Sequence, residues 1–553
     1  MSVVPQWIEG YNPHKPEDAE KYQRLGWWLG MTWGDVLDKA SDIYPNNDAL
    51  VDNIGILSFG ELRAQVDRLA LSLIDMGLAS RDCVLVQLPN WHEYVVAFLA
   101  VQKCGCMVAP MLPRYSEAEI RHFAKLTDAK AWILPAQYGK SDYQLIARKS
   151  KQDNPLLKHV ITVRGDWPGE SLSLEKMIHD ADPSADGVKA IHDRRPDPMQ
   201  VAQILPTGGT TGMPKAAPRT HNDYLSNVEY HSRVWEITLN DTLLVVTPVT
   251  HNLAAHYGVG GALFNFAKLV LLDSTDPEII CQTIEKERVT ALAAVPAIMT
   301  RIVGLQNLGR YDLSSLKKIS AGGAASTPDL INAVWSKIGC KYYNAFGSVE
   351  GACTSTRSDD SSETIRHSVG KPDCPYDTLK IVDLDGSEVP HGQEGELVAK
   401  GPGVFTGYFK SPQDHDAMFT QDGFFRMGDL AKKDEFGNIT ITGRIKDLIN
   451  RGGEMISAGE IENMMSGFPG IESVAVIGMP DPILGERICV YVQASRGATI
   501  EFYEVIKYLK ALGASVLQLP ERLEVIDALP LTKVGKCDKK ALREDIKMRL
   551  GIQ

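Results

Sequence analysis

The stretch that decides the fold is Leu205-Pro-Thr-Gly-Gly-Thr-Thr-Gly-Met-Pro-Lys-Ala-Ala-Pro-Arg-Thr-His-Asn-Asp-Tyr224. The apolar run 201–205 that leads into it predicts a strand. Three glycines can bring the backbone close to a ligand, and three threonine hydroxyls with free N–H groups can surround an anion. Lys215 adds a positive charge, and a helix is expected from Asn222 or Asp223 onward. Strand, glycine-rich loop and lysine together predict a phosphate-binding loop.

This loop is not a Walker A motif, in which Lys directly follows the last Gly and precedes Ser or Thr at a helix start. Here Met213 and Pro214 separate Gly212 from Lys215, and Ala216 follows. A surface turn with an ordinary lysine would look similar, so the loop alone does not identify its ligand. The candidate phosphate-binding residues are Thr207, Gly208, Gly209, Thr210, Thr211, Gly212 and Lys215.

Length and composition limit the classes of protein. A chain of 553 residues exceeds what one core usually supports, so two or more domains are expected. A net charge of −12 argues against general nucleic-acid binding, although a local basic site could hold a phosphorylated ligand. The N-terminus lacks the apolar segment of a signal peptide, and charged residues interrupt the most apolar stretches, so no membrane span is expected. Nine cysteines without metal-ligand spacing indicate reduced thiols and a cytoplasmic location.

Helical and strand patterns alternate through the first half of the chain. Helical periodicity predicts a helix over 60–76, and Ser116 with Glu119 predicts a capping box that opens a helix to about Leu126. Short apolar strands are expected at 82–88, 107–109, 131–134, 243–249, 269–272 and 292–295. Strands that alternate with helices predict a largely parallel α/β sheet. The polar segment 136–200 is expected to cross between sub-structures.

Glycines between 386 and 407 separate short alternating runs, which predicts a small β-rich region. A charged, glycine-rich stretch at 443–453 then precedes a final α/β-type segment. The expected fold is therefore a large N-terminal domain of mostly parallel α/β sheets over 1–442, which includes the β-rich region, followed by a small α+β domain over 448–553.

Further stretches could carry chemistry, although each alone also has an ordinary explanation. The strand end 320–324 could approach a flat ligand or be a plain turn. Glu350 could bind Mg²⁺, which prefers oxygen ligands, or be a solvated acid. Asp429 could accept hydrogen bonds from ribose hydroxyls or form an Asx-turn. The pair His251-Asn252 could line a pocket, and Lys536 near the C-terminus could be functional or merely solvated.

Together, in this order and spacing, these stretches resemble the adenylate-forming superfamily of acyl-CoA synthetases, peptide-synthetase adenylation domains and beetle luciferases, over about residues 30–545. Gly208 stands where that superfamily usually has Ser, and Ala216 where it usually has Gly. Within it, the sequence most resembles the 2,3-dihydroxybenzoate–AMP ligase-like aryl-acid branch. The segments that carry this resemblance are 208–212, 218–224, 251–252, 346–347, 350–351, 356–357, 359–360 and 450–454.

The resemblance implies that a carboxylate is activated with ATP and Mg²⁺, that pyrophosphate leaves, and that the acyl group passes from acyl-AMP to the thiol of CoA or of a carrier-protein phosphopantetheine. It assigns 207–215 to the β- and γ-phosphates, Glu350 to Mg²⁺, and Asp429 with nearby Arg444 to the ribose. Lys536 would reach the carboxylate and the α-phosphate. The adenine is expected beside Gly322, Gly323, Ala324, Asn344, Ala345 and Phe346.

The resemblance also implies a moving domain. The segment 443–447 is the expected hinge, with Lys446 at the hinge position. After adenylation the small domain over 448–553 would rotate, withdraw Lys536 and present Gly452-Gly453 to the thiol entrance, as hinge-type domain movements do.

The identity of the acid depends on a few residues. His251 occupies the family's gate position beside the carboxylate, and Asn252 stands where the aryl-acid branch recognises a substituent ortho to it. Residues 253–258 depart from the dihydroxybenzoate pattern, while Ala345 and Val349 are small and apolar. A pocket that binds a hydroxyl needs a polar partner for it, so a benzoate-like or alicyclic ring acid is favoured over dihydroxybenzoate.

Three functions remain open from the sequence. The first is a carboxylic acid–CoA ligase for a small ring acid. The second is an aryl-acid–AMP ligase that loads a carrier protein in siderophore assembly. The third is a non-catalytic nucleotide-binding protein on the same fold, which the complete set of site residues argues against. A homodimer is compatible with any of the three.

Overall fold

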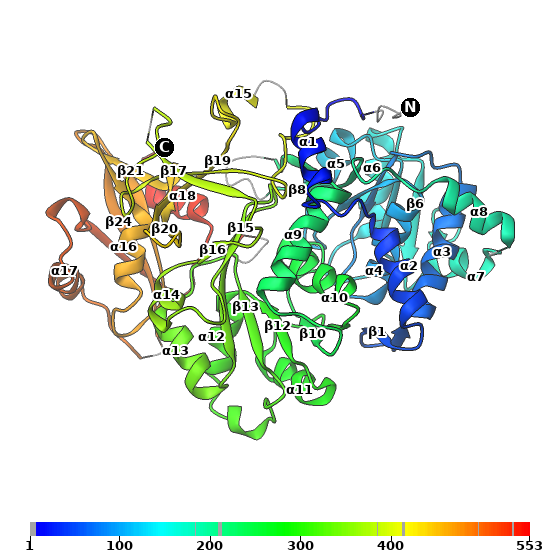
Figure 1. Ribbon diagram of the computed structural model, residues 1–553. Coiled ribbons are helices and arrows are strands. Elements are labelled where there is room, and N and C mark those ends of the chain that lie inside the picture. Colours follow the sequence, from blue (N-terminus) through cyan, green and yellow to red (C-terminus); the bar gives the residue numbers. More distant parts are fainter. Residues whose placement is uncertain are drawn as a thin grey trace.

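The computed structural model of the chain describes residues 7–182, 184–207, 213–383, 385–411, 415–495, 497–532 and 536–552. Its elements form two α/β lobes, a small antiparallel sheet and a C-terminal α+β part, which Figure 1 colours from blue to red along the chain. This arrangement confirms the expected α/β fold class. No helix in the described ranges is long and apolar enough to cross a membrane.

The first lobe contains a sheet of seven described strands in the order β7-β6-β5-β3-β4-β8-β9, parallel except for the last pair. Their bounds are β3 (Cys83–Val86), β4 (Met107–Pro110), β5 (Ala131–Pro135), β6 (His159–Val163), β7 (Leu172–Ser173), β8 (Val201–Pro206) and β9 (Ala216–Thr220). The central strands are continuous apolar runs because helices cover both faces of a parallel sheet. The segment 136–200, expected to cross between sub-structures, instead supplies β6 and β7 of this sheet.

Helices of this lobe begin with the predicted capping chemistry. Ser116 and Glu119 form a capping box at the start of α5, as expected, and Ser58 and Glu61 form another at α3, so that N–H groups left over at each helix start are bonded. The helices are α2 (Trp33–Ile43), α3 (Phe59–Asp75), α4 (His92–Lys103), α5 (Glu117–Leu126), α6 (Tyr143–Asp153), α7 (Leu174–Asp180) and α8 (Ala185–Asp193).

The second lobe contains a sheet of nine described strands in the order β16-β15-β14-β13-β12-β10-β11-β1-β2. Their bounds are β1 (Asp48–Val51), β2 (Ile56–Ser58), β10 (Thr242–Val245), β11 (Lys268–Leu271), β12 (Ala291–Ala294), β13 (Lys318–Ala321), β14 (Lys341–Gly347), β15 (Cys353–Ser355) and β16 (Lys371–Pro372). Its helical elements are α9 (His221–Val234), the π-helix η1 (Ala254–Gly260), α10 (Gly261–Phe264), α11 (Pro277–Glu287), α12 (Pro296–Val303), the 3₁₀ turn η2 (Leu308–Arg310), α13 (Pro328–Lys337) and α14 (Ser362–His367).

The largest hydrophobic core lies between the two sheets. It packs Val84 of β3 and Val245 of β10 against Phe98 of the fully enclosed helix α4 and Tyr224 of α9. Two further cores cover the outer faces, under α5 and α6 on one side and under α11, α12 and α13 on the other. Each large apolar side chain buried in this way contributes roughly 1.5–3 kcal/mol. The two sheets are thereby fixed against each other, and the strand ends that carry the candidate site are fixed with them.

A four-stranded antiparallel sheet in the order β17-β18-β19-β20 confirms the expected β-rich region. Its strands are β17 (Thr378–Val382), β18 (Gly395–Lys400), β19 (Phe425–Lys433) and β20 (Ile439–Arg444), with the helical turn α15 (His415–Met418) before β19. The N-terminal helix α1 (Pro16–Arg24) precedes Trp28, whose Nε1 donates to the Pro402 carbonyl at 2.8 Å. The start of the chain is therefore attached to the loop that follows β18.

The C-terminal part forms a five-stranded sheet with three helices. The turn η4 (Ile445–Asp447) leads from β20 into the first strand of this part. The strands are β21 (Leu448–Arg451), β22 (Glu454–Ser457), β23 (Ile471–Asp481), β24 (Gly485–Ala494) and β25 (Arg522–Ile526). The helical elements are α16 (Ala458–Met465), α17 (Phe502–Ala511), the turn η5 (Val516–Gln518) and α18 (Lys539–Leu550). These elements lie beside β17–β20 in Figure 1, and Ser457 Oγ donates to the Thr442 carbonyl of β20 at 3.0 Å. The exact domain boundaries and the hinge stay predictions.

Candidate active site

The predicted phosphate loop connects two antiparallel strands. Thr207 directly follows β8, is 8% exposed, and donates its backbone N–H to the Lys215 carbonyl at 2.9 Å. Gly208, Gly209, Thr210, Thr211 and Gly212 lie outside the described residues. The helix expected from Asn222 or Asp223 begins at His221, after the strand β9, which the sequence pattern did not predict. Lys215 is therefore held at the edge of the seven-stranded sheet rather than at a helix start.

Glu350 is a buried carboxylate rather than a solvated one. It is 8% exposed, its Oε1 accepts a hydrogen bond from the Tyr408 hydroxyl at 2.5 Å, and its backbone carbonyl accepts from Phe405 N at 2.8 Å. The ring of Tyr408 lies 5.1 Å from the Lys215 ammonium. Tyr408, which sequence reasoning missed, thus joins the predicted metal ligand to the predicted phosphate lysine. Carboxylate oxygens are among the ligands that Mg²⁺ prefers, so Glu350 fits that ion chemically.

The predicted adenine wall lies at the carboxyl ends of two parallel strands, where α/β sheets bind ligands. Ala321 of β13 pairs with Asn344 of β14, and Gly322 and Ala345 follow them. A Cβ on Gly322 would lie 3.1 Å from the Ala345 carbonyl, so this close approach favours glycine. Gly323 has a φ of +85°, a conformation that side chains disfavour. The backbone here fits a flat group.

The side chains along this wall differ in what they offer. The Asn344 side-chain amide donates to the Ser368 carbonyl at 2.8 Å, its backbone N–H donates to Thr356 Oγ1 at 2.9 Å, and its carbonyl accepts from Thr356 N at 3.0 Å, so these contacts fix the residue in the wall. Phe346 and Ala324 are not fully buried, whereas Ala345 is 3% exposed. The sequence placed these residues on the same wall, and the structure brings them together.

The predicted ribose site is formed by a cross-strand pair. Asp429 of β19 lies opposite Arg444 of β20, and Arg444 Nε donates to Asp429 Oδ1 at 2.8 Å. Asp429 is 4% exposed, and burial raises the pKa of its carboxyl although Arg444 and Lys536 act in the opposite direction. A carboxylate accepts several hydrogen bonds, so Asp429 fits a hydroxyl pair chemically.

Lys536 faces the site of the large domain. Desolvation first, and then the charge of Arg444, lower the pKa of its ammonium, while Asp429 and Glu350 raise it. The Lys536 side chain keeps contact with solvent, yet the same ammonium also lowers the pKa of His251. The turn that carries Lys536 is closed by Thr532 N, which donates to its carbonyl at 2.7 Å. The charge of Lys536 and the groups Asp429, Glu350 and His251, which are distant in sequence, therefore influence one another.

His251 is neutral at physiological pH. Burial, with a smaller effect of Lys536, lowers the pKa of its imidazole to about 4. Its Nδ1 accepts from the Leu253 backbone N–H at 3.3 Å, which leaves the proton on Nε2. An uncharged imidazole can border an anionic carboxylate without forming an ion pair with it.

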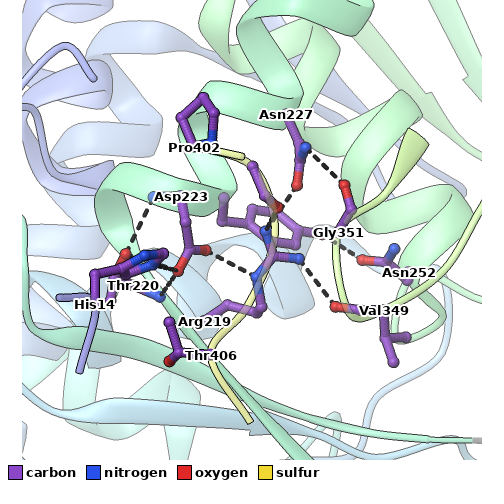
Figure 2. Close-up of polar contacts among 12 residues, drawn as sticks. His14, Arg219, Thr220, Asp223, Asn227, Asn252, Val349, Gly351, Pro402 and Thr406 are labelled. Carbon is purple, nitrogen blue, oxygen red and sulfur yellow. Dashed lines mark hydrogen bonds and ion pairs between the residues drawn. The ribbon is translucent and has the colours of Figure 1, made fainter. Parts of the chain in front are cut away.

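Asn252, which Figure 2 shows together with Val349, is fixed by two hydrogen bonds. Its Oδ1 accepts from the Tyr224 hydroxyl at 2.8 Å and its Nδ2 donates to the Ser348 carbonyl at 3.3 Å. One N–H of the amide is left to donate to a ligand. The predicted acid residues Asn252 and Val349 are thus neighbours, held by polar contacts that their sequence positions did not reveal.

The predicted hinge and thiolation residues lie at the entry of the small domain. Lys446 is in η4, where desolvation and the charge of Arg444 lower the pKa of its ammonium. Gly452 and Gly453 form the turn between β21 and β22, with φ of +65° and +97° that glycine adopts without strain. Gly452 N donates to the Leu484 carbonyl at 2.7 Å. Their movement and their meeting with a thiol stay predictions.

A second group of possible metal ligands, Asp52, His92 and Glu93, lies elsewhere. Arg164 donates to the carboxylates of Asp52 and Glu93 at 2.6 and 2.8 Å, and His92 Nδ1 lies 3.2 Å from Asp52. Arg164 already bonds both carboxylates of this group, so we treat it as part of the framework.

Comparison with known proteins finds matches over both parts of the chain. Residues 37–409 match the AMP-binding enzyme family and residues 460–536 match the AMP-binding enzyme C-terminal domain. A salicylyl-CoA synthase / salicylate adenylyltransferase of a Streptomyces species is 34% identical over 541 residues, with 98% of each chain covered. The salicyl-AMP ligase / salicyl-S-ArCP synthetase of Mycobacterium tuberculosis is 35% identical over 550 residues, with 98% of this chain and 96% of the relative covered. The apo structure of MbtA from Mycobacterium smegmatis matches with a TM-score of 0.73 at 32% identity, over 97% of this chain and 98% of the other.

The chain belongs to the AMP-binding enzyme family. It is an AMP-forming acid ligase that uses ATP and Mg²⁺, with CoA or a carrier-protein phosphopantetheine as the thiol. The expected resemblance to the 2,3-dihydroxybenzoate–AMP ligase-like aryl-acid branch is confirmed, because aryl-acid enzymes of that kind match over nearly the whole chain.

Proposed function

We propose that this protein activates a small ring carboxylic acid as its acyl-AMP and transfers the acyl group to CoA. The proposal is supported by the mutual influence between the charge of Lys536, from the small domain, and the groups Asp429, Arg444, Glu350 and His251 of the large domain. A protein that only bound a nucleotide would not require Lys536, which comes from a separate part of the fold. Transfer of a carboxylate to the α-phosphate requires a cation at that position.

In the first step, a carboxylate oxygen of the acid attacks the α-phosphorus of ATP, and the bond from phosphorus to the bridging oxygen breaks as pyrophosphate leaves. Lys536 neutralises charge between the carboxylate and the α-phosphate, and Lys215 with Thr207 neutralises charge on the leaving phosphates. Glu350 would hold the Mg²⁺, which would supply further charge neutralisation. Asp429 accepts hydrogen bonds from the ribose hydroxyls. Positioning and charge stabilisation of this kind dominate phosphoryl chemistry.

In the second step, a thiolate sulfur attacks the acyl carbon, and the bond from that carbon to the AMP oxygen breaks. Lys536 has no part in this step and must leave the site. The small domain rotates about Lys446 and brings Gly452 and Gly453 to the thiol entrance. The support for this movement is that η4 is a single short turn between two sheets, with Asp447 bonded to Arg543 of α18 at 2.8 Å.

The acid is proposed to be a benzoate-like ring acid, with alicyclic acids as further candidates. Neutral His251 would border the carboxylate, and the remaining N–H of Asn252 would donate to an acceptor atom ortho to it. Ala345 and Val349 leave an apolar surface for the ring. The two relatives described above are named for salicylate, an aromatic acid with an ortho oxygen. Their names support an aromatic acid as the substrate.

The acceptor has two candidates. CoA is our first choice, and one matched relative is named as a CoA synthase. The alternative is an aryl carrier protein in siderophore assembly, and the other matched relative is named as an S-ArCP synthetase. We further expect a cytoplasmic enzyme, consistent with nine unpaired cysteines, and a homodimer stays a possibility to be measured by light scattering.

The test is ATP–pyrophosphate exchange with a panel of acids, followed by thiolation. The panel contains benzoate, salicylate, 2,3-dihydroxybenzoate and cyclohexane carboxylate. We expect the highest kcat/KM with a benzoate or salicylate, and thioester formation with CoA rather than with a phosphopantetheinylated aryl carrier domain. Transfer only to the carrier would establish the alternative. No acid-dependent exchange with any ring acid would contradict the proposed function and support a non-catalytic protein.

A further inference from the structure

The short segment Ser348–Gly351, which follows β14 and carries Glu350, has every one of its carbonyls bonded to a donor from elsewhere. The Ser348 carbonyl accepts from Asn252 Nδ2 at 3.3 Å, and the Glu350 carbonyl accepts from Phe405 N at 2.8 Å. The Val349 carbonyl accepts from one buried side chain directly. The Gly351 carbonyl is connected to the same side chain through Asn227. A segment without regular structure is thus fixed residue by residue.

That side chain is Arg219 of β9, which is 1% exposed and lies at the centre of Figure 2. Its Nη1 donates to the Val349 carbonyl at 2.9 Å, and its Nη2 donates to the Gly403 carbonyl and to Asn227 Oδ1, each at 2.7 Å. Its Nε donates to Asp223 Oδ1 at 2.8 Å. The planar guanidinium therefore binds three separate parts of the chain at fixed angles.

Asn227 extends this contact to the end of the segment. While its Oδ1 accepts from Arg219, its Nδ2 donates to the Gly351 carbonyl at 3.0 Å. Gly351 has a φ of +109°, and a Cβ there would lie 1.9 Å from the Gly403 carbonyl and 2.9 Å from Arg219 Nη2. The backbone of Gly351 therefore packs directly against Arg219, and only glycine allows this.

The charge of Arg219 is balanced in place. Asp223 Oδ2 accepts from Thr220 N at 3.0 Å and from Thr220 Oγ1 at 2.9 Å, and His14 Nε2 lies 3.7 Å from the same oxygen. Arg219 and these donors keep the pKa of Asp223 low against the opposing effect of burial. An apolar residue could fill this volume with similar stability, so the buried pair is better explained by the geometry that it imposes.

The same frame reaches the predicted acid residues. The guanidinium lies 5.3 Å over the ring of Tyr224, whose hydroxyl fixes Asn252. Arg219, Tyr224 and Asn227 all come from β9 and α9, directly after the predicted phosphate loop. One rigid unit thus sets the positions of Glu350, Val349 and Asn252 relative to that loop.

We propose that Arg219 is a positioning residue that fixes the Glu350 carboxylate for the metal and Val349 for the acid. The inference rests on the proposed function, because it assumes that Glu350 binds the metal and that Val349 borders the acid. Arg219 itself touches neither ligand. A displacement of about 1 Å at a reacting centre can cost about 10²-fold in rate, so a frame of this kind matters to catalysis.

The test compares Arg219→Lys with Arg164→Lys. Lysine keeps the charge beside Asp223 but has no planar fork and cannot hold all four acceptors. Arg164 serves as the control, since its guanidinium likewise donates to acceptors on separate parts of the chain, and its described hydrogen bonds reach no proposed site residue. Mn²⁺ is titrated in the presence of a non-hydrolysable ATP analogue and followed by electron paramagnetic resonance. The KM for the acid and the Mg²⁺ dependence are taken from pyrophosphate exchange.

We expect Arg219→Lys to raise the dissociation constant for Mn²⁺ and the KM for the acid by about tenfold each, with metal-free nucleotide binding unchanged. Arg164→Lys should match the wild type in both. A purely structural role would lower only the fraction of active enzyme, with kcat reduced and both constants unchanged, and that result would overturn the proposal.

If Arg219→Lys does not fold, the same two constants are measured for Asn227→Ser. This substitution releases the Gly351 carbonyl and leaves the Arg219–Asp223 pair intact. The same rise in both constants supports the proposal, and wild-type constants refute it. Mn²⁺ binding does not depend on the acid. Failure of the proposed function, seen as absent exchange in the wild type, is therefore distinct from failure of the positioning role.

Discussion

Replacing Asp377 by Asn should stabilise the protein increasingly as the pH rises. Asp377 is 6% exposed, and its Oδ1 accepts from Gly403 N at 3.1 Å, beside the carbonyl that Arg219 binds. Desolvation raises the pKa of its carboxyl from 3.8 to about 7, although Gly403 N and Arg219 oppose this. Between about pH 4 and pH 7, the Asp377 carboxyl is therefore protonated in the folded state and ionised in the unfolded state.

The sign and magnitude follow from linkage. Where the folded state binds the extra proton, stability falls as the pH rises, and the full cost is present above the folded pKa. A pKa difference from 3.8 to about 7, at about 1.4 kcal/mol per pH unit, amounts to roughly 4 kcal/mol. Asparagine keeps the acceptor for Gly403 N and removes the titration. The advantage of Asp377→Asn over the wild type should grow by about 2–3 kcal/mol between pH 5 and pH 8.

The assay is urea unfolding of the two proteins at pH 5, 6, 7 and 8, with Asp385→Asn as a control at an exposed carboxylate. The control should show no pH-dependent difference from the wild type. An Asp377→Asn advantage that stays constant with pH would refute the reasoning, because it would mean that the carboxyl does not take up a proton on folding.

Three further outcomes are expected at the site. The rate of adenylation should fall at alkaline pH, because the Lys536 cation is present below its lowered pKa and lost above it. In a pH–rate profile, Lys536→Arg should move this fall to higher pH. Tyr408→Phe, which keeps the ring beside Lys215 but removes the hydrogen bond to Glu350, should raise the Mg²⁺ concentration for half-maximal pyrophosphate exchange about tenfold, and an unchanged value would contradict it. Lys446→Pro should reduce thioester formation far more than pyrophosphate exchange, whereas equal losses would argue against a hinge there.

The fold class could be predicted because its signals are local. The capping box at Ser116 and the apolar strands of both sheets are determined by neighbouring residues, and they appear where the pattern placed them. The segment 136–200 was misjudged because its strands β6 and β7 are short and flanked by polar residues. Their place in the sheet depends on the pairing of β6 with β5 and of β7 with β6, which a local pattern does not encode.

The strand β9 was missed for a related reason. Ala216–Thr220 contains Pro218, which lacks an N–H and argues against a central strand. The structure places β9 at the edge of the sheet, where its only described partner is β8. An edge position tolerates proline, but the sequence gives no sign of which strand will be the edge.

The residues of the candidate site could be predicted from residue type and order. The residues that hold them in place could not. Arg219 looks like a surface arginine in the sequence, because its partners Val349 and Gly403 lie 130 and 184 residues away. The same holds for Tyr408, which lies 58 residues from Glu350. Such contacts exist only after the two lobes and the loop after β18 have packed together. The residues that hold a site in place are therefore less visible in a sequence than those that act on the substrate.

The central claim is that Lys536 serves the first half-reaction and leaves for the second. The measurement is to compare Lys536→Ala with the wild type in two assays, acid-dependent ATP–pyrophosphate exchange and thioester formation from chemically prepared acyl-AMP and CoA. We predict that exchange falls by about 10²–10³-fold, as for loss of a group that stabilises charge in the transition state, while thioester formation from acyl-AMP stays near the wild-type rate. Equal losses in both assays, or no loss of exchange, would contradict the account.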